Sequence, residues 1–300
     1  MKERILLFCI VFGLGVFIYI FQSYFNTVWG LAILCFLMSL YVGFMNLSYK
    51  LQKRKLQKYP QVINENYKPF VSVLIPAHDE ECVIANTVQN ILDMDYENFE
   101  VIVIDDRSVD NTASVIKDLE QKYDKVTALI RPKDAFPGKS AVLNDAFKIA
   151  KGEAILVFDA DATVDADFLT TLIPHLEPKD VGAVQARKVI RNKNTNLLTR
   201  CQNNEYTLDT YFQVGRDSVK GAVELRGNGE LIKRQAIEDI GGWNNYTIVD
   251  DLDMSTRMHI KGWDIRFCPD AIVYEEGIIY VKPLYLSLIH ISEPTRRVVI

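Results

Sequence analysis

Two aspartates, Asp159 and Asp161, stand two residues apart at the end of the apolar stretch "AILVFDADATV", which covers residues 154–164. Carboxylate oxygens at this spacing can hold a divalent metal ion, because magnesium and manganese prefer oxygen ligands. The first carboxylate could instead be a covalent nucleophile, and the pair could also be a polar turn at the end of a strand. The rest of the chain has to separate these three interpretations.

The elements around this pair are predicted to alternate between strands and helices. Apolar runs predict strands at 70–76, 99–106, 126–131 and 154–161, and helical patterns separate them at 81–94, 112–123 and 140–150. Near-continuous apolar strands joined by helices indicate a parallel sheet that is covered on both faces. We therefore expect an α/β fold with a mostly parallel central sheet.

Acidic residues also follow two of the other predicted strands. Glu80 comes shortly after the first strand, and Asp105 and Asp106 end the second. Ligands of open parallel sheets bind beyond the carboxyl ends of the strands, so these residues should meet Asp159 and Asp161 in one acidic mouth. Closely spaced carboxylates raise one another's pKa, and a cation relieves that repulsion. We expect Mg²⁺ or Mn²⁺ there, together with a phosphate-bearing ligand.

Two classes of enzyme compete for this motif. A haloacid-dehalogenase-like phosphatase would open its domain with the strand that precedes Asp159 and would carry a later Gly-Asp pair, but the sequence contains no Gly-Asp dipeptide. A transferase needs a second acidic site, and Asp250, Asp251 and Asp253 open a predicted helix in "DDLDMSTRMHIKGW". Helix capping accounts for one or two of these acids. One is then free to act as a general base.

The ordered series of motifs resembles the membrane-bound family 2 glycosyltransferases, the group that contains cellulose, hyaluronan and poly-N-acetylglucosamine synthases. The motifs are "SVLIPAHDEE", "VIDDRSVDNT", "PGKSAVLN", "FDADA", "GNGELIKRQAIEDIGGW" and "DDLDMSTRMHIKGW". Within the group, "GGWN", "DDLD", "GWDIRF" and "VYEEG" are most similar to the bacterial enzymes that glucosylate diacylglycerol. The resemblance implies a GT-A domain, the nucleotide-diphospho-sugar transferase fold, over residues 70–277.

The resemblance also implies a role for each motif residue. A UDP-sugar donor would contact Glu80, Asp105 and Asp106 through its nucleoside, and Lys139 through its diphosphate. Asp159 and Asp161 would hold the metal ion on the diphosphate. Asp251 would take the proton from the acceptor hydroxyl during a single displacement that inverts the anomeric centre.

The sequence departs from the family after residue 277. The family continues into Gln-x-x-Arg-Trp, a motif that closes over the diphosphate, but the last tryptophan here is Trp263 and the last glutamine is Gln235. The ending "LSLIHISEPTRRVVI" is unlike the family, so we expect residues 278–300 to be a truncated or artefactual tail. A nucleotide-sugar binder without catalytic activity therefore remains an alternative to the enzyme.

The first part of the chain is predicted to be a membrane hairpin. Residues 5–21 and 28–47 are apolar runs of about the length that spans a bilayer as a helix. Lysines and arginines flank the pair of runs and are missing from the connector, which places both ends in the cytoplasm. We expect two spans in 1–49, a basic linker in 50–69, and a multi-pass protein of the cell (inner) membrane whose catalytic domain is cytoplasmic. A cleaved signal peptide is the alternative for the first span, but no cleavage site follows it.

Composition excludes one class of partner and leaves the substrate open. The net charge of −5 offers no basic excess for nucleic acid. The expected partners are the UDP-sugar donor, the membrane, and a lipid or glycan acceptor. The donor sugar, glucose or N-acetylglucosamine, and the acceptor, diacylglycerol or a growing β-glycan, stay open.

Overall fold

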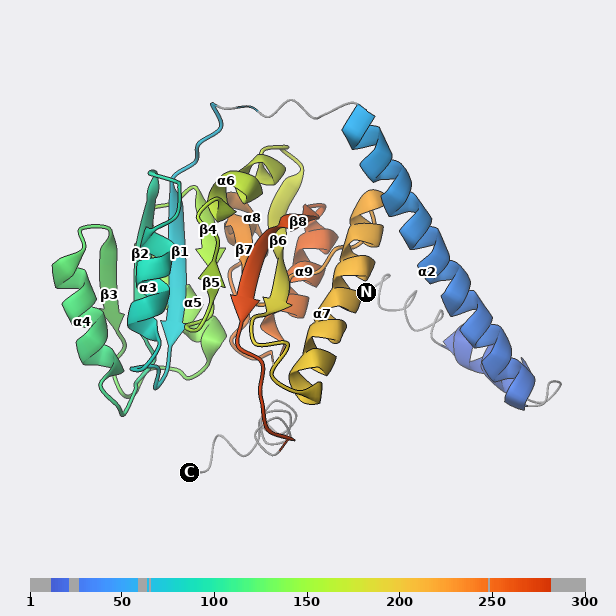
Figure 1. Cartoon of the computed structure of the whole chain (residues 1–300), viewed down its shortest axis with the longest axis horizontal. Helices are drawn as coiled ribbons and strands as arrows, with labels where there is room; N and C mark the ends of the chain where they lie inside the picture. The colour runs from blue at the N-terminus through green and yellow to red at the C-terminus, as the bar shows by residue number, and fades with distance from the viewer. Residues whose placement is uncertain (1–11, 22–26, 59–63, 65, 248, 282–300) are drawn as a thin grey trace.

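We describe the protein from a computed structural model, which covers residues 12–21, 27–58, 64, 66–247 and 249–281 (Figure 1). The strands are β1 (Val71–Ala77), β2 (Phe99–Asp105), β3 (Val126–Ile130), β4 (Ala154–Val157), β5 (Thr163–Val164), β6 (Val181–Ile190), β7 (Glu230–Lys233) and β8 (Asp264–Glu275). The helices are α2 (Thr27–Lys58), α3 (Ile84–Leu92), α4 (Thr112–Lys122), α5 (Lys139–Ile149), α6 (Phe168–Leu172), α7 (Leu197–Ser218), α8 (Arg234–Ile240) and α9 (Asp250–Lys261), with a 3₁₀ turn at Ile173–Leu176.

The strands form one mixed sheet in the order β3-β2-β1-β4-β7-β6-β8-β5. The first four strands in this order are parallel, as the sequence predicts for an α/β fold. β7 is antiparallel to both of its neighbours, and β5 is antiparallel to β8. The chain builds the sheet outward from β1 to β3 and then returns to the other side of β1 with β4. This reversal opens a crevice at the carboxyl ends of β1 and β4.

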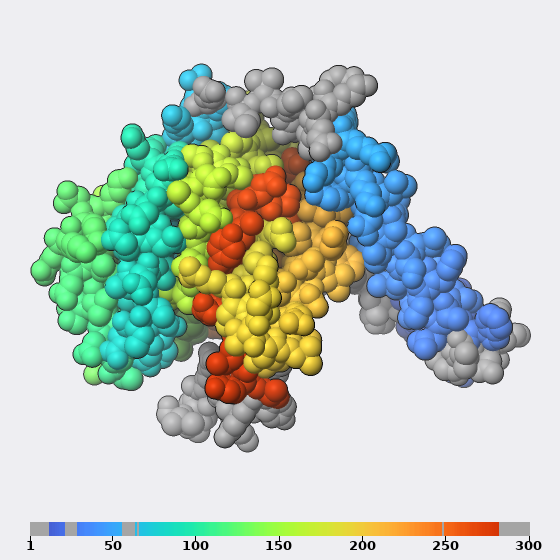
Figure 2. Space-filling view, in the orientation of Figure 1, coloured from blue at the N-terminus to red at the C-terminus, as the bar shows by residue number. Residues whose placement is uncertain are grey.

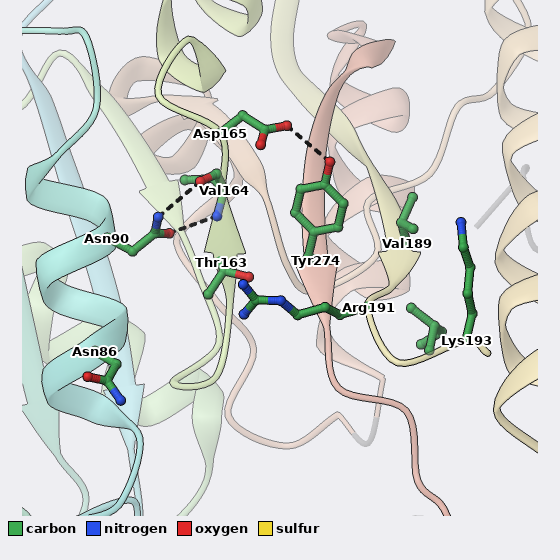
Figure 3. A pocket seen from close by; sticks show the side chains of 10 residues that line it. Asn86, Asn90, Thr163, Val164, Asp165, Val189, Arg191, Lys193 and Tyr274 are labelled. Carbon is green, nitrogen blue, oxygen red and sulfur yellow. Dashed lines mark hydrogen bonds between the residues drawn. The ribbon is translucent and has the colours of Figure 1, made fainter. Parts of the chain in front are cut away.

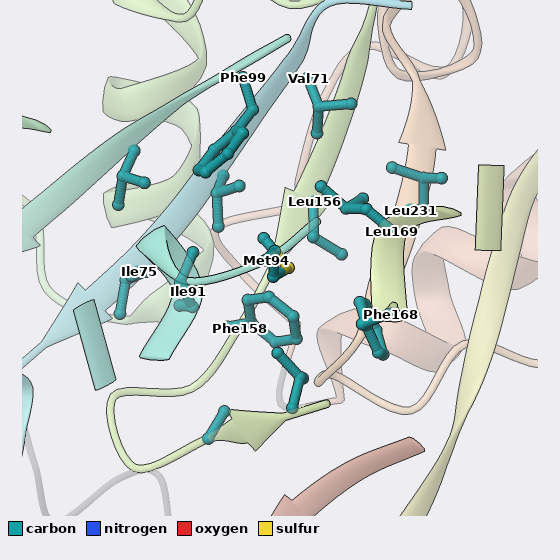
Figure 4. Close-up of a cluster of buried hydrophobic side chains, with 14 of the residues drawn as sticks. Val71, Ile75, Ile91, Met94, Phe99, Leu156, Phe158, Phe168, Leu169 and Leu231 are labelled. Carbon is teal, nitrogen blue, oxygen red and sulfur yellow. The ribbon is translucent and has the colours of Figure 1, made fainter. Parts of the chain in front are cut away.

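Helices cover both faces of the sheet, and the strands β1, β2 and β4 are buried along almost their whole length. One buried cluster lies under α3, α4 and α6, where the rings of Phe158 and Phe168 are 5.3 Å apart (Figure 4). The other lies under α5, α8 and α9 and includes Met254 and Met258. Burial of these side chains fixes the sheet, because apolar surface removed from water contributes about 25 cal/mol per Å². The sheet is the rigid base that carries the loops of the site.

The amino-terminal region contains one candidate membrane span among the residues that the structure describes. By length and composition α2 could cross a membrane over Trp29–Lys55, whereas the apolar helix Phe12–Phe21 is shorter. Part of the predicted first span, residues 5–11, lies outside the described residues. The second predicted span is therefore supported as a helix, but the multi-pass hairpin is not. α2 stands out from the domain in the space-filling view (Figure 2).

α2 contacts the domain through α7. Met45 on α2 is buried, and a Cβ atom added to Gly215 on α7 would lie 2.6 Å from the Cβ of Met45. Only glycine permits this approach of the two helices. The contact fixes α2 against the catalytic domain near the carboxyl end of α7.

Candidate active site

A cleft of about 740 Å³ opens at the carboxyl ends of β1, β2 and β4. Five of the seven predicted site residues line it, namely Glu80, Asp106, Lys139, Asp159 and Asp161. They come from three loops and from the first residue of α5, which the parallel strand order brings to one edge of the sheet. The predicted acidic mouth is thus present in the structure.

Asp106 is held at the edge of the cleft by two arginines. Arg131 Nη1 lies 2.5 Å from Asp106 Oδ1, and Arg107 Nε lies 2.9 Å from the same oxygen. Burial opposes ionisation of Asp106, but the hydrogen bonds and charges of Arg107 and Arg131 outweigh it and lower its pKa. Asp106 is therefore a carboxylate at neutral pH, fixed in position and able to accept a hydrogen bond from a ligand. The arginines were not predicted from the sequence.

Asp105 lies behind the cleft rather than among its lining residues. It ends β2 and is 2% exposed, and its Oδ1 has no hydrogen-bond partner in the described part of the chain. Its backbone carbonyl accepts the N–H of Arg131 at 3.1 Å. The predicted contact between Asp105 and the nucleoside stays a prediction, and the unpartnered buried oxygen is the observation that favours it.

Lys139 joins the Asp159–Asp161 motif to a loop that is distant in sequence. Its Nζ lies 2.5 Å from Asp159 Oδ1 and donates a hydrogen bond to the carbonyl of Gly227 at 2.7 Å. Burial lowers the pKa of this ammonium, but the charge and hydrogen bond of Asp159 outweigh it, so the pKa is raised. Lys139 is therefore a fixed cation at the centre of the cleft, available to an anionic ligand.

Asp161 and Glu80 are two carboxylic acids of the acidic mouth whose pKa values are raised. Burial raises the pKa of Asp161, and the neighbouring Asp159 and Glu275 raise it further. The pKa of Glu80 is also raised, first by burial and then by Asp161. A cation bound between these groups would remove the repulsion.

The donor set fits magnesium or manganese. Asp159 and Asp161 offer carboxylate oxygens, and among the described residues no group of three or more His, Cys, Asp or Glu side chains surrounds a metal position. Magnesium sites at phosphate ligands are commonly held by one or two carboxylates, with the substrate supplying further oxygens. The chain therefore supplies only part of the oxygen ligands of such a metal ion, and the oxygens of a diphosphate would complete them.

Asp251 and Lys139 both lie near the Cα of Gly227, on the side where a side chain would stand. A Cβ atom added to Gly227 would lie 3.6 Å from Asp251 Oδ2 and 3.7 Å from Lys139 Nζ. Burial raises the pKa of Asp251, while the backbone N–H of Leu252 and the charge of Lys139 oppose the shift. A half-buried carboxylate with a raised pKa is suited to accept a proton. Asp253, two residues on, instead pairs with Arg257 Nε at 2.7 Å and stabilises the helix.

The loop "RGNGE" supplies residues that the sequence reading left without a role. The Asn228 side chain accepts the backbone N–H of Asp159 at 3.2 Å and donates to Glu275 Oε1 at 2.8 Å. Glu275 also accepts from Lys188 Nζ at 2.8 Å and from the hydroxyl of Tyr206 at 2.7 Å. This buried network fixes the backbone of Asp159 from below. The only signals in the sequence were the motifs "GNGE" and "VYEEG".

Glu230 is a second buried acid beneath the site. Its Oε1 accepts the backbone N–H of Gly227 at 2.5 Å, and it is 3% exposed. Burial raises its pKa to about 8, although the charge of Lys139 opposes the shift. Glu230 is therefore largely protonated at neutral pH and supports the Gly227 turn.

A sheet of this order, with Asp-x-Asp after the fourth strand in the chain and an acidic helix start across the cleft, defines the GT-A class of glycosyltransferases. The fold matches the mannosyltransferase PcManGT from Pyrobaculum calidifontis, solved in complex with GDP-Man and Mn²⁺, with a TM-score of 0.65 and 25% identity. That match covers 85% of this chain and 70% of the other. The fold of Staphylococcus aureus TarS is also similar, with a TM-score of 0.52 and 16% identity over 69% of this chain and 60% of the other.

The chain belongs to glycosyltransferase family 2, because the family model described as "Glycosyltransferase like family 2" matches residues 69–291. It is 44% identical to a beta-monoglucosyldiacylglycerol synthase of Nostoc sp. over 70% of this chain and 45% of that protein. It is 31% identical to a poly-beta-1,6-N-acetyl-D-glucosamine synthase of Staphylococcus aureus over 73% of this chain and 52% of that protein. The chain thus spans about half the length of these curated relatives. The family excludes the phosphatase interpretation of Asp159.

Proposed function

We propose that the protein is an inverting, metal-dependent glycosyltransferase that moves a sugar, glucose in the first instance, from a UDP-sugar to a membrane-proximal acceptor. One observation carries the proposal: Lys139, whose Nζ lies 2.5 Å from Asp159 Oδ1, lines the cleft with Asp159 and Asp161, and Asp251 lies near the same Nζ beside Gly227 although it does not line the cleft. These groups provide a base, a fixed cation and a metal-binding pair. Single displacement needs all three around the anomeric carbon.

The residues divide the work as follows. Asp106 and Glu80, with Asp105 behind them, would bind the nucleoside, and Lys139 would bind the diphosphate. Asp159 and Asp161 would hold the metal ion, which when bound supplies Lewis-acid stabilisation of the leaving diphosphate. Asp251 would take the proton from the attacking hydroxyl.

The proposal includes two alternative acceptors, a diacylglycerol and a growing β-glycan. The two relatives above are named for one product of each kind. We also propose that α2 anchors the chain in the cell (inner) membrane with the catalytic domain in the cytoplasm, because basic residues in 50–55 follow its apolar stretch. A second span in residues 5–21, which would make the protein multi-pass, rests on the sequence alone.

The test compares three substitutions in the full chain. Asp251→Asn should keep UDP binding and lose about 10²- to 10⁴-fold in transfer rate, the usual contribution of a general base. Asp159→Asn should lose metal-dependent donor binding. Asp253→Asn is the matched control, because Asp253 stands in the same helical turn but faces Arg257. Full transfer activity in Asp251→Asn would remove this residue from the mechanism.

The assay follows radiolabelled UDP-glucose, UDP-N-acetylglucosamine and GDP-mannose with magnesium or manganese. Label extracted into organic solvent would identify a glycolipid product, and label in an alcohol-insoluble fraction would identify a polymer. Binding of a nucleotide sugar without transfer or hydrolysis would favour the alternative, a binder without catalytic activity.

A further inference from the structure

A short segment before β7, residues 225–228, contacts three groups of the proposed mechanism. The carbonyl of Gly227 accepts a hydrogen bond from Lys139 Nζ at 2.7 Å. The amide side chain that follows Gly227 accepts the backbone N–H of Asp159 at 3.2 Å. A Cβ atom added to Gly227 would lie 3.6 Å from Asp251 Oδ2. The position of this segment therefore helps to set the distances among Lys139, Asp159 and Asp251.

Side chains, rather than a strand, hold the backbone of this segment. The next residue, Gly229, donates its N–H to the carbonyl of Val157 on β4 at 2.9 Å, and its carbonyl accepts the N–H of Ala186 on β6 at 3.0 Å. Three successive N–H groups of the segment instead donate to buried side chains on α9, β6 and β7: Leu225 to Ser255 Oγ at 2.8 Å, Arg226 to Gln185 Oε1 at 2.7 Å and Gly227 to Glu230 Oε1 at 2.5 Å. Buried N–H groups need an acceptor, so these side chains fix the path of the segment.

Gln185 bonds to the segment on both sides of Gly227. Its Oε1 accepts the N–H of Arg226, and its Nε2 donates to the carbonyl of Asn228 at 2.8 Å. Nε2 also donates to the carbonyl of Ala186 at 2.8 Å, and the side chain is 0% exposed. Removing a buried amide that makes three hydrogen bonds leaves buried backbone groups unpaired, which is costly. The amide of Gln185 therefore holds the residue whose carbonyl binds Lys139.

Ser255 joins the same segment to the helix that carries the proposed base. Its Oγ accepts the N–H of Leu225 at 2.8 Å and donates to the carbonyl of Asp251, one turn earlier on α9, at 2.7 Å. Ser255 is 1% exposed. One buried hydroxyl thus links the start of α9 to the segment that holds Lys139.

A similar contact occurs at a segment that carries no group of the proposed mechanism. In the pocket drawn in Figure 3, the amide of Asn90 donates to the carbonyl of Val164 at 3.0 Å and accepts the N–H of the same residue at 2.8 Å. Asn90 holds one residue of the edge strand β5 against α3. Gln185 differs because its amide bonds to the two residues that flank Gly227.

We propose that Gln185 and Ser255 are positioning residues for sugar transfer. By fixing residues 225–228, they set where the ammonium of Lys139 and the carboxylate of Asp251 stand relative to Asp159. The inference rests on the proposed function. It adds two residues that are too buried to contact the donor or the acceptor.

Loss of this support should lower kcat more than it raises KM. Negative charge grows on the leaving diphosphate, and the acceptor proton moves, as the bond to the sugar breaks, so Lys139 and Asp251 act mainly in the transition state. The nucleoside side of the cleft is held separately, by the ion pair of Arg131 with Asp106. A displacement of about 1 Å at a reacting group can cost about 100-fold in rate.

The experiment measures transfer of labelled sugar by the full chain in the parent, Gln185→Met and Ser255→Ala. Methionine keeps much of the volume of glutamine and removes its hydrogen bonds. Ser255→Ala removes a single hydroxyl, so it keeps the proposal testable where Gln185→Met does not fold. We expect kcat to fall about 10- to 100-fold in each variant, with the donor KM within about threefold of the parent.

Ser72→Ala is the matched control, because Ser72 is also a buried side chain that holds a turn. It is 0% exposed, and its Oγ accepts the N–H of Gly152 at 2.7 Å and donates to Glu100 Oε1 at 2.7 Å. Ser72 lies at the amino end of β1, whereas the donor cleft lies at the carboxyl end. Ser72→Ala should lower Tm but keep kcat within about threefold of the parent.

Hydrogen exchange followed by mass spectrometry reports on the segment without any need for transfer. Gln185→Met leaves the N–H of Arg226 without its acceptor, so the amides of residues 225–228 should exchange about 10-fold faster. Ser72→Ala should leave this exchange unchanged and accelerate it at Gly152 instead.

The two measurements separate this inference from the proposed function. An active parent whose kcat survives either substitution would overturn the proposal for that residue and leave the proposed function in place. An equal fall of kcat in Ser72→Ala, or exchange in 225–228 that Gln185→Met leaves unchanged, would also overturn it. A parent that transfers no sugar would refute the proposed function, whereas faster exchange in Gln185→Met would still support the fixing of residues 225–228.

Discussion

Replacing Arg131 with methionine should destabilise the domain more than any other change to a charged residue around Asp106. The Arg131 side chain is 3% exposed, and it pairs with Asp106 at 2.5 Å and with Asp145 at 2.9 Å. It also donates a hydrogen bond to the carbonyl of Phe136 at 2.9 Å. Methionine fills much of the same volume but donates no hydrogen bond.

The size of the effect follows from the burial of the partners. Removing one member of a buried ion pair costs about 3–5 kcal/mol, because the remaining charge loses its partner. Asp106 keeps Arg107, and Asp145 is 36% exposed and can be hydrated, so we expect the lower end, about 3 kcal/mol. For a domain of this size that corresponds to a fall in Tm of about 6–12 °C.

The assay is thermal unfolding of the full chain in detergent, with Arg107→Met as the matched control. Arg107 also pairs with Asp106, but its side chain is 25% exposed and makes no second ion pair in the described residues. Exposed pairs contribute about 0–1 kcal/mol, so this control should shift Tm by less than about 4 °C. Equal shifts in the two variants, or a Tm for Arg131→Met within about 2 °C of the parent, would refute the reasoning.

The same pair predicts a pH dependence. The pKa of Asp106 is lowered in the folded state, so its stabilising contribution is present above the unfolded pKa and is lost as the pH falls through the folded pKa. Arg131→Met should raise that pKa. The Tm difference between parent and variant should therefore shrink on acidification below the ordinary range of aspartate, and a difference that grows would contradict this assignment.

Two further substitutions test the Gly227–Glu230 turn. Burial raises the pKa of Glu230 to about 8 in the folded state. The stability that Glu230 contributes is therefore present below its unfolded pKa and is lost as the pH rises from there toward 8. Over this pH range, thermal melts of Glu230→Gln should show a smaller loss of stability than melts of the parent. Gly229→Ala should cost about 1–3 kcal/mol, because φ is +68° and the new Cβ would lie 2.5 Å from Val273 Cγ2. Gly241→Ala, with φ of +81° and nothing within 4 Å, is the control for backbone strain alone and should cost about 1 kcal/mol by the same melts.

The sequence was sufficient for the parts of the site that depend on local pattern and strand direction. Apolar runs ending in acids predicted β1, β2 and β4, and parallel strands share one edge, so Glu80, Asp106 and Asp159 could be expected together. The pattern did not reveal that β7 runs antiparallel between β4 and β6. A strand of four residues, three of them buried, carries no periodicity from which its direction could be read.

Only the tertiary structure decided which side chains contact one another across the cleft. Lys139 meets Asp159 and Gly227, which are 20 and 88 residues away, and Arg131 meets Asp106 across 25 residues. Asp251 comes close to Lys139 beside Gly227 from a helix that follows every strand except β8. These contacts depend on how α5, α9 and the Gly227 turn pack on the sheet. The residue types along the chain therefore determined the chemistry on offer, and packing between distant segments determined which groups act together, because distances across a fold are not encoded in local spacing.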